Sequence, residues 1–128
     1  MAKKVFLISG MHRCGTSFIT SSLHKFGLKL PKNIGPPSED NPKGHFEPID
    51  IVKINDEILK YQNFDWVHIS EINKSKFKVK AIQNYKKRIF EKIKENYKSF
   101  ENILIKDPRI SILFPLYEQI FQDKKYEL

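Results

Sequence analysis

Residues 4–27 read KVFLISGMHRCGTSFITSSLHKFG and set the class of fold that the rest of the chain can complete. The segment 3–9 contains a continuous apolar run that ends at Gly10, which is typical of a buried strand. From Ser17 onward apolar residues recur close to one helical face, namely Phe18, Ile19, Leu23 and Phe26. Gly27 then supplies a common stop signal for a helix. The stretch therefore predicts a strand, a glycine-containing loop and a helix.

The loop between this strand and this helix has the glycine spacing of a P-loop, with Gly10 and Gly15 separated by four residues. Glycine lets the backbone wrap closely around an oxyanion, and the start of a helix points unpaired amides at the same place. Thr16 stands where a Walker-type loop has lysine, so Arg13 is the only permanent cation inside the loop. The loop predicts a phosphate or sulfate site. The alternative is an ordinary strand-to-helix turn in which Thr16 or Ser17 caps the helix.

Downstream segments predict further helices and one more strand. The apolar run at 102–106 ends in polar residues at Lys106 and Asp107, as a second strand would. Helical periodicity covers 49–61, the lysine-rich stretch 74–98 and the residues from Ile110 onward, whereas five prolines in 31–48 predict a long loop. This order is typical of an α/β layer sandwich with a parallel sheet, which binds ligands at the carboxyl ends of its strands. With two confident strands, we expect residues 1–128 to form a single but incomplete domain.

The charge balance favours anionic partners. The chain has 23 basic and 15 acidic residues, a formal charge of +8. Lysines crowd between Lys74 and Lys98, which indicates either a docking face for nucleic acid or an acidic polymer, or a solvated helix face. We favour the solvated face, because aromatic residues do not interleave with these lysines as a single-strand binding surface requires. Nucleic acid is therefore not expected as a partner.

Two features bear on location. The apolar run from Val5 to Ile8 is too short for a secretory signal or a membrane span. Cys14, the single cysteine, cannot form an internal disulfide. Both features favour a reduced, cytoplasmic setting.

Three ordered blocks resemble PAPS-dependent sulfotransferases, where PAPS is 3′-phosphoadenosine 5′-phosphosulfate. Residues 5–23, VFLISGMHRCGTSFITSSL, resemble the 5′-phosphosulfate loop of that family. Residues 40–47, DNPKGHFE, and residues 105–109, IKDPR, followed by 113–115, LFP, look like two further blocks of bacterial members with an arginine in this loop. Their common order along the chain makes a chance match improbable.

The resemblance implies transfer of a sulfonate from PAPS to a hydroxyl or amine, by in-line displacement without a metal. It implies that the sandwich is the three-layer, P-loop NTPase-like type. Arg13 would stabilise the charge that develops on the leaving phosphate. Cys14 departs from the family's usual serine, although its backbone amide can still donate. The implied contacts with the 5′ end of PAPS come from His12, Arg13, Cys14, Gly15, Thr16 and Ser17.

The resemblance also implies residues at the reaction centre. The acceptor must lose a proton, and Glu47 is the first choice of general base, with His45 in the same loop. Lys106 and Asp107 stand where many sulfotransferases place residues at the reacting group. The alternatives are that Glu47 is an acid in the first turn of the next helix, that Lys106, Asp107 and Arg109 form an internal ion-pair network, and that His45 is an exposed loop residue.

Other parts of the function stay open at this level. Relatives carry the 3′-phosphate site on a third strand and the helix after it, which would begin beyond Leu128, so we expect weak PAPS binding by residues 1–128 alone. A small molecule or a glycan is expected as acceptor, with its identity and the oligomeric state undetermined. The other candidate classes are a P-loop kinase or ATPase, which would need a lysine at position 16 and a Mg²⁺ site, and a noncatalytic module for anions or nucleic acid.

Overall fold

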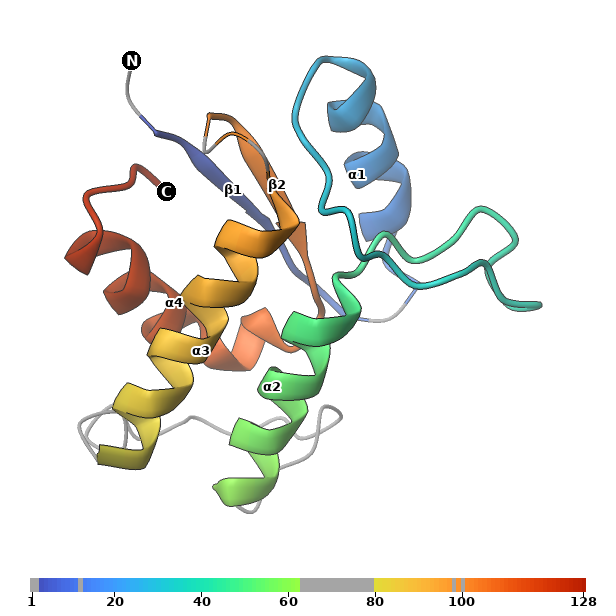
Figure 1. Cartoon of the computed structure of the whole chain (residues 1–128). Coiled ribbons are helices and arrows are strands. Elements are labelled where there is room, and N and C mark those ends of the chain that lie inside the picture. Colours follow the sequence, from blue (N-terminus) through green and yellow to red (C-terminus); the bar gives the residue numbers. More distant parts are fainter. Residues whose placement is uncertain (1–2, 12, 63–79, 98, 100) are drawn as a thin grey trace.

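A computed structural model of the chain describes residues 3–11, 13–62, 80–97, 99 and 101–128. Within these residues, two strands and four helices follow one another in the predicted order (Figure 1). They are β1 (Val5–Ile8), α1 (Thr16–Lys25), α2 (Ile49–Tyr61), α3 (Lys80–Asn96), β2 (Ile103–Lys106) and α4 (Ile110–Asp123). The strands are shorter than the predicted segments 3–9 and 102–106. The 74–79 part of the predicted lysine-rich helix 74–98 lies outside the described residues.

The two strands pair in parallel, so their carboxyl ends lie at one edge of the sheet. Val5 is opposite Ile103, and Ile8 is opposite Lys106. On the other side of β1, Glu127 pairs in parallel with Lys4, through hydrogen bonds of 2.8 and 3.0 Å to the backbones of Val5 and Lys3. The chain therefore has the predicted mixed α/β class with a parallel sheet, and β1 has a neighbour on both sides.

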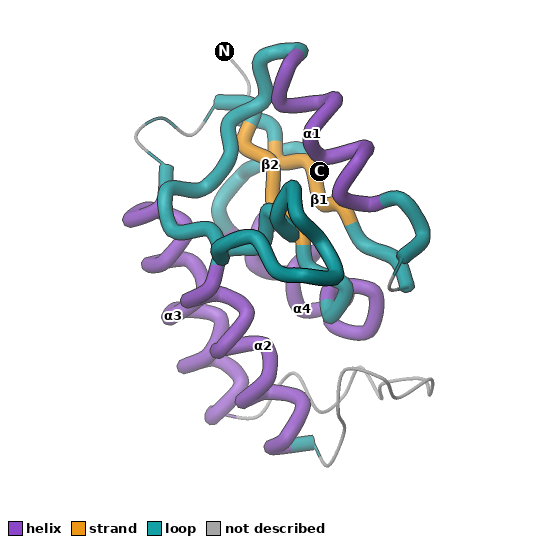
Figure 2. The backbone as a smooth tube through the Cα atoms, turned by 90° about the vertical axis from the view of Figure 1, so that its right-hand side faces the viewer, coloured by secondary structure: helices purple, strands orange, loops and turns teal. Residues whose placement is uncertain are grey.

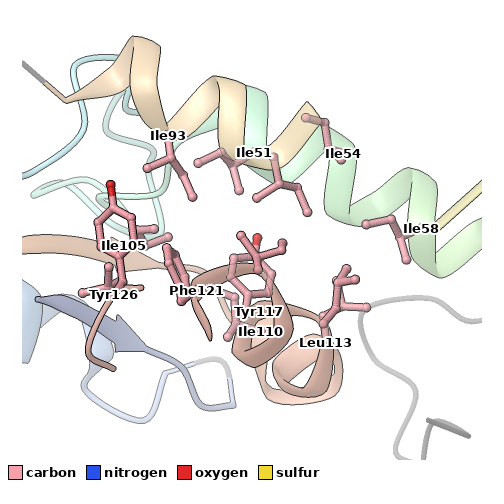
Figure 3. Packing of buried hydrophobic residues seen from close by; sticks show 14 of the residues in the cluster. Ile51, Ile54, Ile58, Ile93, Ile105, Ile110, Leu113, Tyr117, Phe121 and Tyr126 are labelled. Carbon is pink, nitrogen blue, oxygen red and sulfur yellow. The ribbon is translucent and has the colours of Figure 1, made fainter. Parts of the chain in front are cut away.

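Three helices cover one face of this sheet. Val5 of β1 and the alternate residues Ile103 and Ile105 of β2 belong to the same buried cluster as side chains of α2, α3 and α4. Figure 3 shows the helical members on both sides of this core, with Ile51, Ile58 and Ile93 facing Leu113, Tyr117 and Phe121. The lysine-rich helix α3 is amphipathic, and its buried side is formed by Ile82, Ile89 and Ile93.

Helix α1 lies on the opposite side of the strands from α3 (Figures 1 and 2). Its apolar stripe is not buried against the described residues, in contrast to the usual outcome for an amphipathic helix. Phe18 is 76% exposed and Phe26 is 84% exposed, and the buried side chains are Thr16 and Thr20. Among the described elements, α1 packs mainly against β2.

The long segment 31–48 forms no helix or named strand, as its prolines predict, but it is tied to the rest of the fold. Asn96, at the end of α3, accepts a hydrogen bond from the backbone of Asn33 at 2.9 Å and donates to Asp50 in the first turn of α2. Ile34 also forms a bridge with Pro48. These contacts hold both ends of the loop and direct residues 38–47 toward the carboxyl edge of the strands.

None of the helices in the described part of the chain is long and apolar enough to cross a membrane.

Candidate functional site

The loop after β1 is tight at Gly10 and has a left-handed backbone at Arg13 and Gly15. A Cβ atom at Gly10 would lie only 2.8 Å from the Cys14 sulfur and 3.3 Å from the Thr16 side chain, so only glycine fits there without a shift. Gly15 has a φ of 89°, and Arg13 has a φ of 59°. Such left-handed residues let successive amides turn toward a common centre, which is the geometry of an anion-binding nest. A non-glycine residue held in this conformation is also a feature that clusters at functional sites.

The start of α1 completes this loop. Gly15 is the N-cap residue, and no side chain caps the first turn of the helix. The first amides of a helix have no partner within it, and together with the helix dipole they attract an anion. Thr16 is buried, and its carbonyl accepts a hydrogen bond from the Thr20 hydroxyl at 2.7 Å, which fixes this first turn. The loop and the first turn of α1 therefore form a backbone cradle that could hold a small anionic group.

The cradle opens into a pocket of about 260 Å³. Three segments far apart in the sequence line it: the loop and first turn of α1, the loop 40–45, and the end of β2. The lining residues are Arg13, Gly15, Thr16, Ser17, Asp40, Asn41, His45, Lys106 and Pro108. Parallel pairing explains the meeting of the first and third segments, because both follow strands that end at the same edge of the sheet.

Lys106 supplies a second cation at this pocket. It is only 3% exposed, and its Nζ donates to the Oε1 atom of Glu47 at 2.8 Å. The Glu47 side chain is 18% exposed. Phe46, which precedes Glu47, has a φ of 58°, so the backbone is in a left-handed conformation where the loop reaches Lys106. A buried lysine that lines the pocket and a partly buried glutamate thus form an ion pair at this site.

Asp107 lies beneath the pocket, with no exposed surface, and it joins β2 to α2 and α4. Its Oδ2 atom accepts from Asn55 at 2.8 Å, and its Oδ1 atom accepts from the Arg109 guanidinium at 2.9 Å. The Tyr117 hydroxyl donates to Asn55 at 2.9 Å. Burial raises the pKa of Asp107, and the neighbouring Arg109 and Asn55 oppose that rise. Asp107 therefore holds other residues in place and does not face the pocket.

Arg109 gathers three carboxylates around one guanidinium. Its Nε atom lies 2.6 Å from Asp56, and its Nη1 atom lies 2.9 Å from Asp107 and 3.9 Å from Glu47. Burial lowers the pKa of Arg109, but Asp107 and Asp56 raise it by more, so the pKa lies above its usual value. Of the ion-pair network considered for Lys106, Asp107 and Arg109, the Asp107–Arg109 pair is present, whereas Lys106 pairs with Glu47.

The loop 38–45 covers the cradle from the other side. Asn41 donates to the Ser17 hydroxyl at 3.3 Å, and its side-chain amide nitrogen lies 3.4 Å from His45 Nδ1. The Ser38 hydroxyl lies 3.1 Å from His45 Nε2 and also donates to Asp40, and this hydrogen bond lowers the pKa of Asp40. His45 is therefore part of a hydrogen-bonded loop that lines the pocket.

The structure gathers most of the residues that the sequence singles out. Arg13, Gly15, Thr16, Ser17 and Lys106 line one pocket, with Glu47 directly behind Lys106. The lone cysteine, Cys14, is exposed, and its thiol is free. His12 lies outside the described residues.

Sequence reasoning missed the supports of this site. Asn41, from the DNPKGHFE block, reaches Ser17, and no pattern predicted that contact. Asn55 and Tyr117, which hold Asp107, were also missed. A signal for Asn55 is present, because it is a polar residue between Ile51 and Ile58 on the buried side of α2. A polar residue on an apolar stripe indicates a buried hydrogen-bond partner.

The described residues bring two cationic side chains to this site, those of Arg13 and Lys106. Within the same residues, no group of three His, Cys, Asp or Glu side chains is arranged to hold a metal ion.

Comparisons with protein-family models, with curated proteins and with solved structures found no match.

Replacing Arg109 with methionine should lower the free energy of unfolding by about 3–5 kcal/mol, because it leaves Asp107 charged and buried without its partner. The matched control is Arg88→Met, which removes an exposed two-bond pair with Glu57 and should cost about 0–1 kcal/mol. Urea denaturation of both variants measures the difference. Equal losses in the two variants would contradict a structural role for the Asp107 network.

Proposed function

We propose that the chain carries the donor-binding part of a PAPS-dependent sulfotransferase. The observation that carries this proposal is the convergence of an uncapped helix N-terminus, Arg13 and Lys106 on one pocket at the carboxyl ends of two parallel strands. The proposed fold type, a P-loop NTPase-like three-layer sandwich, is consistent with helices on both sides of the sheet.

The residues present fit the 5′ end of PAPS. The cavity of about 260 Å³ falls just below the range of about 300–1,000 Å³ typical of complete ligand sites, so it suits the phosphosulfate group better than a whole nucleotide. The Gly15 position leaves open space within 4 Å, so an oxyanion could approach the amides. When bound, PAPS would supply an activated sulfonate and a phosphate leaving group.

The charges of the pocket favour sulfonate transfer over phosphoryl transfer. A sulfuryl group carries less negative charge than a phosphoryl group, so it needs less neutralisation in the transition state. Thr16 lacks the ammonium group that a kinase or ATPase loop places on terminal phosphates. Arg13 and Lys106, together with the amides of the α1 N-terminus, are sufficient to hold the phosphate and to stabilise charge as it leaves.

Glu47 is the proposed general base, and its pairing with Lys106 connects base and donor site. In the structure the carboxylate of Glu47 is held by the ammonium of Lys106 at 2.8 Å. An anion in the cradle competes for the same ammonium group, because Lys106 lines the pocket. Movement of Lys106 toward the anion would free an oxygen of Glu47 to accept a proton from a hydroxyl or amine acceptor. The proposed acceptor is a small molecule or a glycan.

Calorimetric titration with adenosine 3′,5′-bisphosphate tests the donor site. The chain should bind the bisphosphate in preference to ATP with Mg²⁺, and Arg13→Ala should weaken this binding about tenfold, because one charge-assisted contact is lost. Arg88→Ala, which removes an arginine that pairs with Glu57, is the matched control and should leave the affinity unchanged. Preference for ATP with Mg²⁺ would favour the kinase or ATPase alternative and contradict the proposal.

Substitutions at Glu47 and Lys106 test the proposed competition. Glu47→Gln should tighten binding of the bisphosphate about threefold to tenfold, because it releases Lys106 and removes a negative charge beside the cradle. Lys106→Met should weaken binding about tenfold. Competition titrations against a fluorescent bisphosphate analogue measure both effects. Weaker binding by Glu47→Gln would mean that Glu47 only holds Lys106 in its binding position.

A further inference from the structure

A second groove, separate from the proposed donor pocket, runs between α3 and α4. Its volume is about 310 Å³, and it shares no lining residue with the pocket at the α1 N-terminus. Phe90 and Ile120 supply apolar surface from the two helices. Around them stand four lysines and two acids, namely Lys86, Lys87, Lys94, Lys124, Glu91 and Asp123.

Basic side chains outnumber acidic ones in this groove. Lys86 forms an ion pair with Asp123 at 3.0 Å, with the lysine side chain 11% exposed. That pairing uses one of the two acids and leaves Glu91 among three exposed lysines. Two of these lysines gather at one aromatic ring, because the Nζ atoms of Lys94 and Lys124 lie 5.6 and 5.1 Å from the Phe90 ring centre. Aromatic rings attract ammonium groups, so Phe90 keeps like charges from two helices at one place.

We propose that this groove binds a compact polyanion, a small ligand with at least two sulfate or phosphate groups. Ammonium groups from both helices would each take one anionic group, because gathered cations repel one another until an anion neutralises them. Ile120 would contact the apolar face of the ligand scaffold, while Phe90 would keep the two ammonium groups of Lys94 and Lys124 in place. This site does not depend on the proposed sulfotransferase activity.

The size and surroundings of the groove favour a compact ligand over a nucleic acid strand. A single-stranded nucleic acid needs a continuous row of cationic side chains and open aromatic faces on which its bases can stack. On α3 the basic surface is interrupted by Glu91 and Glu95, and Glu95 pairs with Lys92 at 2.6 Å. The Phe90 ring is already in contact with two ammonium groups, so base stacking would have to displace them.

Titration of the full chain with sucrose octasulfate and with inositol hexakisphosphate tests this site. The double variant Lys94→Gln/Lys124→Gln should bind about tenfold more weakly or worse, because two charge-assisted contacts are lost. The matched control is Lys53→Gln/Lys60→Gln, which removes the same charge from exposed positions on α2 and should bind as the unmodified chain does. Thermal unfolding monitored by circular dichroism checks that both variants are folded.

Four results would overturn the proposal. Equal weakening in both double variants would assign binding to overall charge, and loss of binding in Arg13→Ala would assign it to the α1 cradle. Tighter binding of a single-stranded oligonucleotide, lost in Lys94→Gln/Lys124→Gln, would make the groove a nucleic-acid site. The absence of binding by either polyanion would also contradict it. Because Arg13 lies outside this groove, failure here leaves the donor-site proposal unaffected, and the reverse also holds.

Discussion

Parallel pairing of β1 with β2 is the constraint on which the candidate site depends. It places the loop after Ile8 beside the residues after Lys106, although nearly a hundred positions separate them in the sequence. One strand end leads into an uncapped helix that offers amides, and the other delivers a buried lysine. An antiparallel pair would put these two ends at opposite edges of the sheet. The parallel direction of the two strands thus determines which residues meet at the pocket.

A buried network of hydrogen-bonded side chains supports the pocket from beneath. Tyr117, Asn55, Asp107 and Arg109 connect α4, α2 and the end of β2 through hydrogen bonds of 2.8 to 2.9 Å. Such a network is stable only if its members are satisfied, and these are. Its last member approaches Glu47, which in turn holds Lys106. The catalytic proposal for Asp107 is therefore best replaced by a positioning role, while Glu47 and Lys106 keep the proposed chemical ones.

The local sequence pattern was sufficient to predict the helices and strands. It did not predict contacts between residues far apart in the sequence. The apolar runs at Val5–Ile8 and Ile103–Lys106 and the glycines of the loop predicted the strands and the cradle, because these signals are local. The periodicity of α1 predicted the helix but not the exposure of Phe18 and Phe26, since periodicity identifies an apolar face without identifying what covers it. The contact of Asn41 with Ser17 and the role of Asn55 depend on residues far away in sequence. The sulfotransferase assignment remains a proposal that rests on resemblance and pocket geometry together.

The most direct measurement is the change in backbone amide chemical shifts of the ¹⁵N-labelled chain on addition of adenosine 3′,5′-bisphosphate. The account predicts that the largest shifts fall on Gly15, Thr16 and Ser17, with a second set at the end of β2 around Lys106. Shifts confined to the α3–α4 groove, or a uniform response that follows the ionic strength, would contradict the claim that the α1 N-terminus holds the anionic end of the donor.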